Sequence, residues 1–121
     1  MIINCLVVGA GGAIGAVMRY LFCLLPLRPQ NGFPVTTLAV NLSGAFCLGL
    51  IVALAGRNVD FNPRLLLFLK IGLCGGFTTF STFSTETMSL LQEGKIIVAV
   101  SYMALSVVLC VSAVAAAQAI V

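Results

Sequence analysis

Apolar residues fill four long blocks of the chain, and short polar breaks separate the blocks. The blocks cover Ile2–Leu25, Phe33–Ala55, Leu65–Leu91 and Ile96–Val121. A bilayer core about 30 Å thick requires about 20 residues of helix, so each block is long enough to cross it. The pattern predicts an all-α, polytopic membrane protein with four transmembrane helices in one domain, residues 1–121.

The breaks between the blocks are too short to hold an extramembrane domain. They cover Pro26–Asn31, Gly56–Pro63 and Gln92–Lys95. The composition agrees, because 61% of the residues are hydrophobic and 7% are charged, whereas a soluble domain carries about a quarter charged residues. A cleavable signal peptide is the alternative for the first block, but no basic region precedes it and the remaining chain would still be membranous.

The cationic residues give almost no orientation signal. The side of the N-terminus, second loop and C-terminus holds Arg57, Arg64 and Lys70, and the other side holds Arg19, Arg28 and Lys95. The side richer in such residues normally stays cytoplasmic, and here the two sides are equal. Either another feature fixes one orientation, or the chain inserts both ways and opposite copies form an antiparallel homodimer. We favour the second, because four helices enclose little volume and twofold dimers are the commonest closed assembly.

The cysteines give no indication of a metal centre. No two of the five share the spacing of metal ligands, and the chain has no histidine, which argues against zinc or a haem ligand. A cysteine in an apolar block behaves as a small hydrophobic residue. The five are Cys5, Cys23, Cys47, Cys74 and Cys110.

The first block contains a glycine-rich run, VVGAGGAIG at residues 7–15. A dinucleotide-binding turn would need a βαβ context and an acidic residue about 20 positions later, and the first acidic residue is Asp60. The spacing of Gly11 and Gly15, with Gly12 and Ala16 beside them, instead predicts close packing of two helix backbones.

Arg19 lies inside the first block, some six residues before its end. A charge at membrane depth costs about 2.5–3.5 kcal/mol on insertion scales unless it meets water or a partner. One interpretation is that the side chain extends to the membrane surface. The other is a fixed positive charge at the floor of an aqueous vestibule, where it would attract anions.

Two narrow polar stripes run along the second and fourth blocks. Thr37, Asn41 and Gly44 share one helix face. The fourth block repeats a polar-leaning residue every four positions, at Tyr102, Ser106 and Cys110. Interhelical hydrogen bonds, typically below about 1 kcal/mol each, are the simplest explanation of such stripes. Two stripes together with a third polar run are harder to explain by packing alone.

The third polar run is GGFTTFSTFSTET at residues 75–87. Gly72, Gly75 and Gly76 weaken the helix and predict a broken third helix, whose freed carbonyls near a dimer axis suit a cation. The hydroxyls that follow donate hydrogen bonds without negative charge, which suits an anion. The electropositive ring edges of Phe80 and Phe83 suit an anion as well.

Two further residues of this run are Phe77 and Glu86. Phe77 could lie on the same side as the other two rings or simply pack. Glu86 is the only acidic residue near the run, and we interpret it as a charge near the membrane surface. No carboxylate lies deep enough in the other blocks to relay protons or cations.

The sequence resembles the Fluc (CrcB) family of fluoride channels over the whole chain. The resemblance lies in GGFTTFSTFSTET, in TTLAVNLSG around Asn41, in GAVMRY around Arg19 and in the four spans. It implies a dual-topology homodimer in the lipid of the bacterial inner membrane, with two antiparallel pores at the subunit interface. The implied activity is passive export of fluoride from the cytoplasm, with no enzymatic activity and no nucleic acid partner.

The resemblance also implies roles for individual residues. Phe80 and Phe83 match an aromatic pair whose ring edges contact fluoride, Asn41 matches a pore-lining asparagine, and Arg19 matches a vestibule arginine. Other polar positions of the pathway correspond to Ser81, Thr82, Thr37, Tyr102 and Ser106.

The backbone carbonyls of Gly75 and Thr78 match ligands of a structural Na⁺ on the dimer axis, two from each subunit. One departure concerns Cys110 and Val114, which stand where some relatives carry hydroxyls. The outer part of the polar track is therefore in doubt.

Three other functions fit these residues less well. A small multidrug exporter would need a membrane-embedded glutamate in the first helix, but that helix has no acidic residue and contains Arg19. An assembly factor would use the stripes for packing and would show no ion flux. An intramembrane enzyme is disfavoured, because without histidine or an acid pair inside the spans no base can activate a nucleophile.

Overall fold

The computed structural model describes residues 1–121 and contains helices only. Three passes are single helices: α1 (Ile2–Cys23), α2 (Val35–Arg57) and α6 (Ile96–Ile120). The third pass, Pro63–Gln92, consists of α3 (Pro63–Leu66), η1 (Leu67–Cys74), α4 (Gly75–Phe77) and α5 (Phe80–Gln92). All four passes are long and apolar enough to cross a membrane. The predicted all-α architecture is confirmed, with span ends shifted by no more than two residues.

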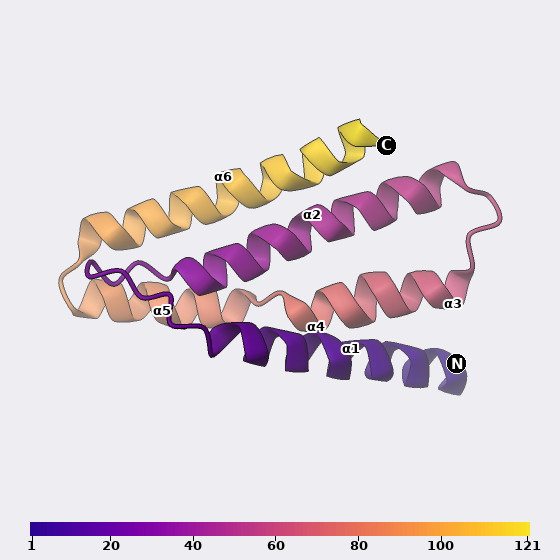
Figure 1. Cartoon of the computed structure of the whole chain (residues 1–121), viewed down its shortest axis with the longest axis horizontal. Coiled ribbons are helices and arrows are strands. Elements are labelled where there is room, and N and C mark those ends of the chain that lie inside the picture. Colours follow the sequence, from indigo (N-terminus) through magenta and orange to yellow (C-terminus); the bar gives the residue numbers. More distant parts are fainter.

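The four passes run alongside one another, with the third pass between α1 and α2 (Figure 1). α6 packs against α2, while α1 packs against η1 and α4. The two termini lie at the same end of the bundle as the loop between α2 and α3. The sequence-based assignment of loops to two ends is therefore confirmed.

Local sequence signals set the ends of the third pass. The Asn62 side chain accepts hydrogen bonds from the backbone N–H groups of Arg64 (2.9 Å) and Leu65 (3.3 Å), which caps the first turn of α3. Pro63 follows at the first helical position, where its missing N–H has no helical partner to lose. After α5, Gly94 adopts a positive φ of 79° and turns the chain toward α6.

Glycines bring α1 into direct backbone contact with the third pass. A Cβ placed at Gly15 would overlap the carbonyl oxygen of Leu73 and lie 2.8 Å from the Phe77 nitrogen. A Cβ at Gly11 would lie 2.6 Å from the Phe68 carbonyl oxygen. No other residue fits at these two positions, so the predicted close packing through GxxxG is confirmed.

The third pass is irregular in two places, and the sequence predicted only one of them. η1 is a π-helix, a rare form with i→i+5 hydrogen bonds. The break then falls at Thr78 and Thr79, which are extended with ψ of 158° and 123°. The break was expected around Gly72, Gly75 and Gly76, but those residues stay helical. Gly72 and Gly76 instead fit against the α1 backbone.

The single chain buries few of its apolar side chains. Of its 121 residues, 15 are buried, and many large hydrophobic side chains on α1, α5 and α6 face outward. Such a surface is stable only in contact with lipid or with further protein. The predicted antiparallel homodimer would cover part of this surface and stays a prediction.

Candidate functional site

The break in the third pass is held open by one side chain of α2. The Asn41 amide nitrogen donates to the carbonyl oxygen of Thr79 (2.9 Å), and the Asn41 amide oxygen accepts from the N–H of Thr79 (2.8 Å). Both backbone groups of Thr79 lost their helical partners at the break, and the amide replaces them. Asn41 thus stabilises the extended backbone at the break, and its place in a fluoride pathway stays a prediction.

Arg19 reaches the same break from α1. Its Nε donates to the carbonyl oxygen of Gly76 at 3.3 Å, and the side chain is partly buried. The guanidinium therefore binds the middle of the third pass and does not extend along the lipid to the membrane surface. A fixed positive charge at the break is the arrangement that the vestibule interpretation requires, and the vestibule itself stays a prediction.

The carbonyl oxygens of Gly75 and Thr78 have lost their usual helical donors at the break. The donor four residues after Gly75 is the Thr79 N–H, which binds Asn41, and the donor four residues after Thr78 is the Thr82 N–H, which binds the Thr79 hydroxyl. Gly75 is exposed and Thr78 is half-buried. Backbone oxygens left without donors at membrane depth need water, a cation or another chain.

Phe80 and Phe83 begin a chain of aromatic contacts on α5. Their ring centroids are 5.5 Å apart, and Phe83 makes an edge contact with Tyr102 at 5.0 Å. Phe80 is 79% exposed, so its ring edge is open to the outside of the chain. Phe77 is buried and packs edge-on against Phe22 at 5.7 Å. Phe77 is therefore a packing residue.

Glu86 lies at the centre of a hydrogen-bonded trio that sequence reasoning missed. One carboxylate oxygen accepts from the Thr37 hydroxyl (3.1 Å) and the other from the Tyr102 hydroxyl (3.0 Å). Thr37 is buried and Tyr102 has no exposed surface. Glu86 is thus a partly buried acceptor that joins α2, α5 and α6, and its expected place near the membrane surface stays a prediction. The only signal in the sequence was an acid three residues after Phe83, inside an apolar pass.

Half of the hydroxyls of α5 are satisfied within their own helix. The Ser84 hydroxyl donates to the Phe80 carbonyl, and those of Thr85 and Thr87 donate to carbonyls one turn earlier. These residues explain part of the hydroxyl-rich run as ordinary intrahelical bonding. The Thr82 hydroxyl differs, because it accepts from the Thr79 hydroxyl at 3.1 Å. Ser81 is exposed, with its hydroxyl 3.4 Å from that of Thr79.

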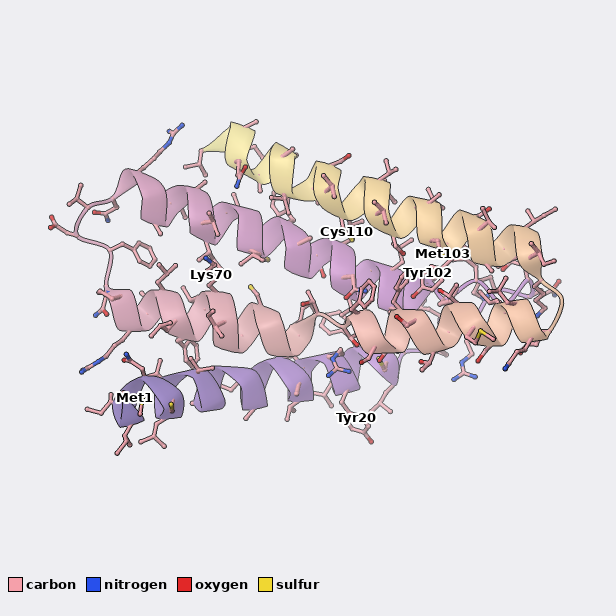
Figure 2. All side chains as sticks on the ribbon, turned by 180° about the vertical axis from the view of Figure 1, so that it is seen from behind. Met1, Tyr20, Lys70, Tyr102, Met103 and Cys110 are labelled. Carbon is pink, nitrogen blue, oxygen red and sulfur yellow. The ribbon has the colours of Figure 1, made fainter.

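The α6 stripe contains a polar atom with no partner. The Ser106 hydroxyl is buried, with the residue 8% exposed, and forms no hydrogen bond. An unpartnered buried hydroxyl favours a ligand, water or a further chain beside it. Cys110 follows one turn later and is half-buried. Tyr102 and Cys110 mark the two ends of this stripe (Figure 2).

A cavity of about 550 Å³ opens beside the Glu86 trio. Thr37, Glu86 and Thr82 line it together with residues of the loop between α1 and α2. Arg28 and Lys95 also line it, and Lys95 forms an ion pair with Glu93 at 3.3 Å. The cavity connects the polar side chains of the site with one end of the bundle.

The structure thus brings the predicted residues together in two neighbouring groups. The first surrounds the break, and the second surrounds Glu86. The Thr79–Thr82 hydrogen bond joins the two groups, while Ser106 is bonded to neither. The first group contains Arg19, Asn41, Gly75 and Thr78, and the second contains Thr37, Thr82, Phe83 and Tyr102.

Comparison with known proteins gives matches over nearly the whole chain. "Fluoride-specific ion channel FluC" of Shewanella halifaxensis is 44% identical over 119 residues, which is 98% of this chain and 95% of that protein. The protein of the same name from Ruminiclostridium cellulolyticum is 43% identical over 113 residues, 93% and 87% of the two chains. The one from Agrobacterium fabrum is 42% identical over 119 residues, 98% and 95% of the two chains.

These relatives are bacterial, and with four apolar passes the chain is a multi-pass protein of the bacterial inner membrane. Residues 6–118 match the family described as "CrcB-like protein, Camphor Resistance (CrcB)". The chain therefore belongs to the CrcB family.

Proposed function

We propose that this protein is a fluoride-selective ion channel that lets fluoride leave the cytoplasm passively. It is then a transporter rather than an enzyme. The observation that carries the proposal is the chemistry gathered at the broken third pass: neutral amide and hydroxyl donors, an exposed phenyl edge and a tethered arginine. The names of the curated relatives, fluoride-specific ion channels, support it.

The proposed pathway replaces the hydration shell of a small anion with fixed donors. The unshared N–H of the Asn41 amide, the hydroxyls of Ser81 and Thr82 and the ring edges of Phe80 and Phe83 supply the partial positive charge. The carboxylate of Glu86 lies beside these donors, where the hydroxyls of Thr37 and Tyr102 bind it. Arg19 adds a full positive charge and disfavours cations, while several weak sites in series allow an ion to leave as well as enter.

The hydrogen bonds to Glu86 limit what two of the proposed pathway residues, Thr37 and Tyr102, can do. The hydroxyls of Thr37 and Tyr102 already donate to Glu86. They can donate to fluoride only if they turn away from the carboxylate. We therefore assign them a stabilising role when the pathway is empty and a donor role when the anion passes. The unpartnered hydroxyl of Ser106 is free to donate at any time.

A second copy in the opposite orientation completes the proposed channel. The third pass exposes Gly75, Phe80 and Ser81, although these residues belong to the pathway. A lipid-facing pathway would leave its polar groups in hydrocarbon, so a partner chain must cover them. An antiparallel homodimer would do so and would contain two equivalent pathways. The equal split of cationic residues between the two sides supports both orientations.

We infer that a sodium ion binds at the carbonyl oxygens of Gly75 and Thr78, whose usual helical donors bind elsewhere. Gly75 and Thr78 would each give one oxygen, and two copies would together give four. The hard oxygen donors and the lack of side-chain charge suit Na⁺ better than a transition metal. When bound, the ion would join the two broken helices and add positive charge near the pathway.

Purified protein in liposomes tests the proposal directly. Vesicles are loaded with potassium fluoride or potassium chloride, and valinomycin is added to make their membranes permeable to potassium. The efflux of fluoride or chloride is followed with ion-selective electrodes. We expect rapid loss of fluoride and retention of chloride. Equal loss of both ions, or loss of neither, would overturn the proposal. Loss of neither ion is also the result that an assembly factor would give.

A further inference from the structure

Lys70 is a cation inside the third pass that the proposed pathway does not yet use. It lies in η1, seven residues after Pro63 and eight before the break at Thr78. At about 1.5 Å per residue it is about 10 Å from the start of a 30-residue pass, which places it near the edge of a hydrocarbon layer about 30 Å thick. The only ion pair of the chain joins Lys95 to Glu93, so no carboxylate neutralises Lys70. An unpaired cation within a transmembrane segment is a candidate for a place on an ion route.

The π-helix decides which way Lys70 faces. In an α-helix, residues five apart lie on different faces, whereas a π-helix joins residues five apart by a hydrogen bond and places them nearly above one another. A Cβ placed at Gly75 would have the Lys70 carbonyl oxygen as its nearest neighbour, at 3.9 Å. Lys70 and Gly75 are both exposed. Gly75 directly follows η1, and its own N–H bonds to the Gly72 carbonyl. The 3.9 Å approach therefore places the backbone of Lys70, one π-turn earlier, beside Gly75.

Lys70 and Gly75 before the break, and Phe80 and Ser81 after it, are all exposed. Figure 2 shows Lys70 on the half of the bundle that holds Met1, on the other side of the break from Tyr102. Lys70 therefore lies between one end of the bundle and the break. If a second copy covers Gly75 and Phe80, it also lies opposite Lys70.

We propose that Lys70 is an anion-capture site in a water-filled space between the two copies, on the approach to Phe80. The inference rests on the proposed function and extends it to a residue outside the pathway. The ammonium group raises the concentration of small anions near the break, and Arg19 continues the positive potential inward. A cation on the Gly75 carbonyl would repel Lys70, and an anion between them offsets this repulsion.

Substitution of Lys70 at varied ionic strength tests the capture role. Fluoride efflux from liposomes is measured for the parent, Lys70→Gln and Lys70→Arg at low fluoride. Potassium isethionate is varied from about 10 mM to about 1 M, which shortens the Debye length from about 30 Å to about 3 Å. We expect Lys70→Gln to be about threefold slower at low salt and equal to the parent at high salt. Lys70→Arg keeps the charge and the parental rate.

Arg64→Gln is the matched control, because Arg64 is exposed at the start of the same pass. Its rate should equal that of the parent at every salt concentration. A Lys70→Gln rate equal to that of the parent at low salt would overturn the inference. A rate reduced by the same factor at every salt concentration would also overturn it, because the effect would not be electrostatic. Failure of the parent itself to release fluoride would instead overturn the proposed function.

A second measurement needs no substitution. The chain has two lysines, Lys70 and Lys95. Reconstituted parent protein is treated with a membrane-impermeant, water-soluble N-hydroxysulfosuccinimide acetate, and acetylation is quantified by peptide mass spectrometry. Lys95 serves as the internal reference for an exposed amine. We expect acetylation of both lysines, and slower fluoride efflux at low salt after treatment. An unmodified Lys70 beside a modified Lys95 would overturn the inference.

Discussion

Asn41 binds both backbone groups of Thr79, with hydrogen bonds of 2.8 and 2.9 Å across 38 residues of sequence. The two bonds fix the extended residue between α4 and α5 relative to α2. The Thr79 hydroxyl then accepts from the N–H of Thr82 at 3.1 Å and caps α5. The break is thus a defined structure with satisfied backbone groups rather than a flexible hinge.

Asn41→Asp should open this structure, because a carboxylate oxygen would face the carbonyl oxygen of Thr79. One hydrogen bond is lost and a repulsion replaces it, which should lower the free energy of unfolding by about 1–3 kcal/mol. We expect fluoride efflux to fall at least tenfold, since the same amide is a proposed donor to the anion. Efflux from liposomes and thermal unfolding in detergent measure the two effects.

Ser43→Ala is the control for Asn41→Asp on the same helix. The Ser43 hydroxyl donates only to carbonyl oxygens of its own helix, Ala39 at 2.8 Å and Val40 at 3.1 Å. Its removal should change neither stability nor efflux. An Asn41→Asp protein with parental stability would show that the two hydrogen bonds do not hold the break.

Gly15→Ala tests the backbone contact between α1 and the third pass. The new methyl group would overlap the Leu73 carbonyl and crowd the Phe77 nitrogen, and neither backbone can move without shifting a helix. We expect a loss of about 1–3 kcal/mol or more in unfolding free energy, measured by denaturant titration in detergent. Gly9→Ala is the matched control, because no heavy atom lies within 4 Å of its new methyl group. Equal stability of the two variants would contradict the packing that we describe.

The fold was predictable from the sequence because membrane insertion depends on hydrophobicity and length alone. The position of the break was not. Gly72 and Gly76 are common signals of a weak helix, but here they serve close approach to α1. The extended conformation at Thr78 and Thr79 depends on Asn41, a residue far away in sequence. A local pattern cannot reveal such a partner.

The Glu86 trio escaped prediction for a related reason. Its hydroxyl donors come from helices 49 and 16 residues away in the chain. The stripes on α2 and α6 were recognised separately, and nothing in either stripe indicated that they converge on one carboxylate. Thr37 and Tyr102 were expected as pathway residues, and their contact with Glu86 is the new information.

Glu86 and Tyr102 should be energetically coupled. Glu86→Met keeps roughly the size of the side chain but removes both acceptor oxygens, and Tyr102→Phe removes one donor. Because each single change already breaks the same hydrogen bond, the double variant should lose less stability than the sum of the two. We expect a coupling energy of about 0.5–3 kcal/mol in a double-mutant cycle of unfolding free energies. Strictly additive losses would argue that the 3.0 Å contact contributes nothing.

Phe80 and Phe83 should separate fluoride transport from stability, because one ring is exposed and the other is packed. Phe80 is 79% exposed, whereas Phe83 contacts both Phe80 and Tyr102. Phe83→Ile loses an edge contact with Tyr102, a type of pair worth about 0.5–1.5 kcal/mol, and should lower the thermal midpoint. Phe80→Ile should leave the helical content and its melting unchanged, as judged by circular dichroism.

Both substitutions should slow fluoride efflux at least tenfold, because isoleucine offers no electropositive ring edge to the anion. Tyr20→Ile is the control, since Tyr20 is an exposed aromatic residue on α1 that forms no ring pair in the chain. Its efflux should match that of the parent. If Phe80→Ile released fluoride as fast as Tyr20→Ile, the ring edge would have no part in conduction, and the donors of Asn41, Ser81 and Thr82 would have to bind the anion alone.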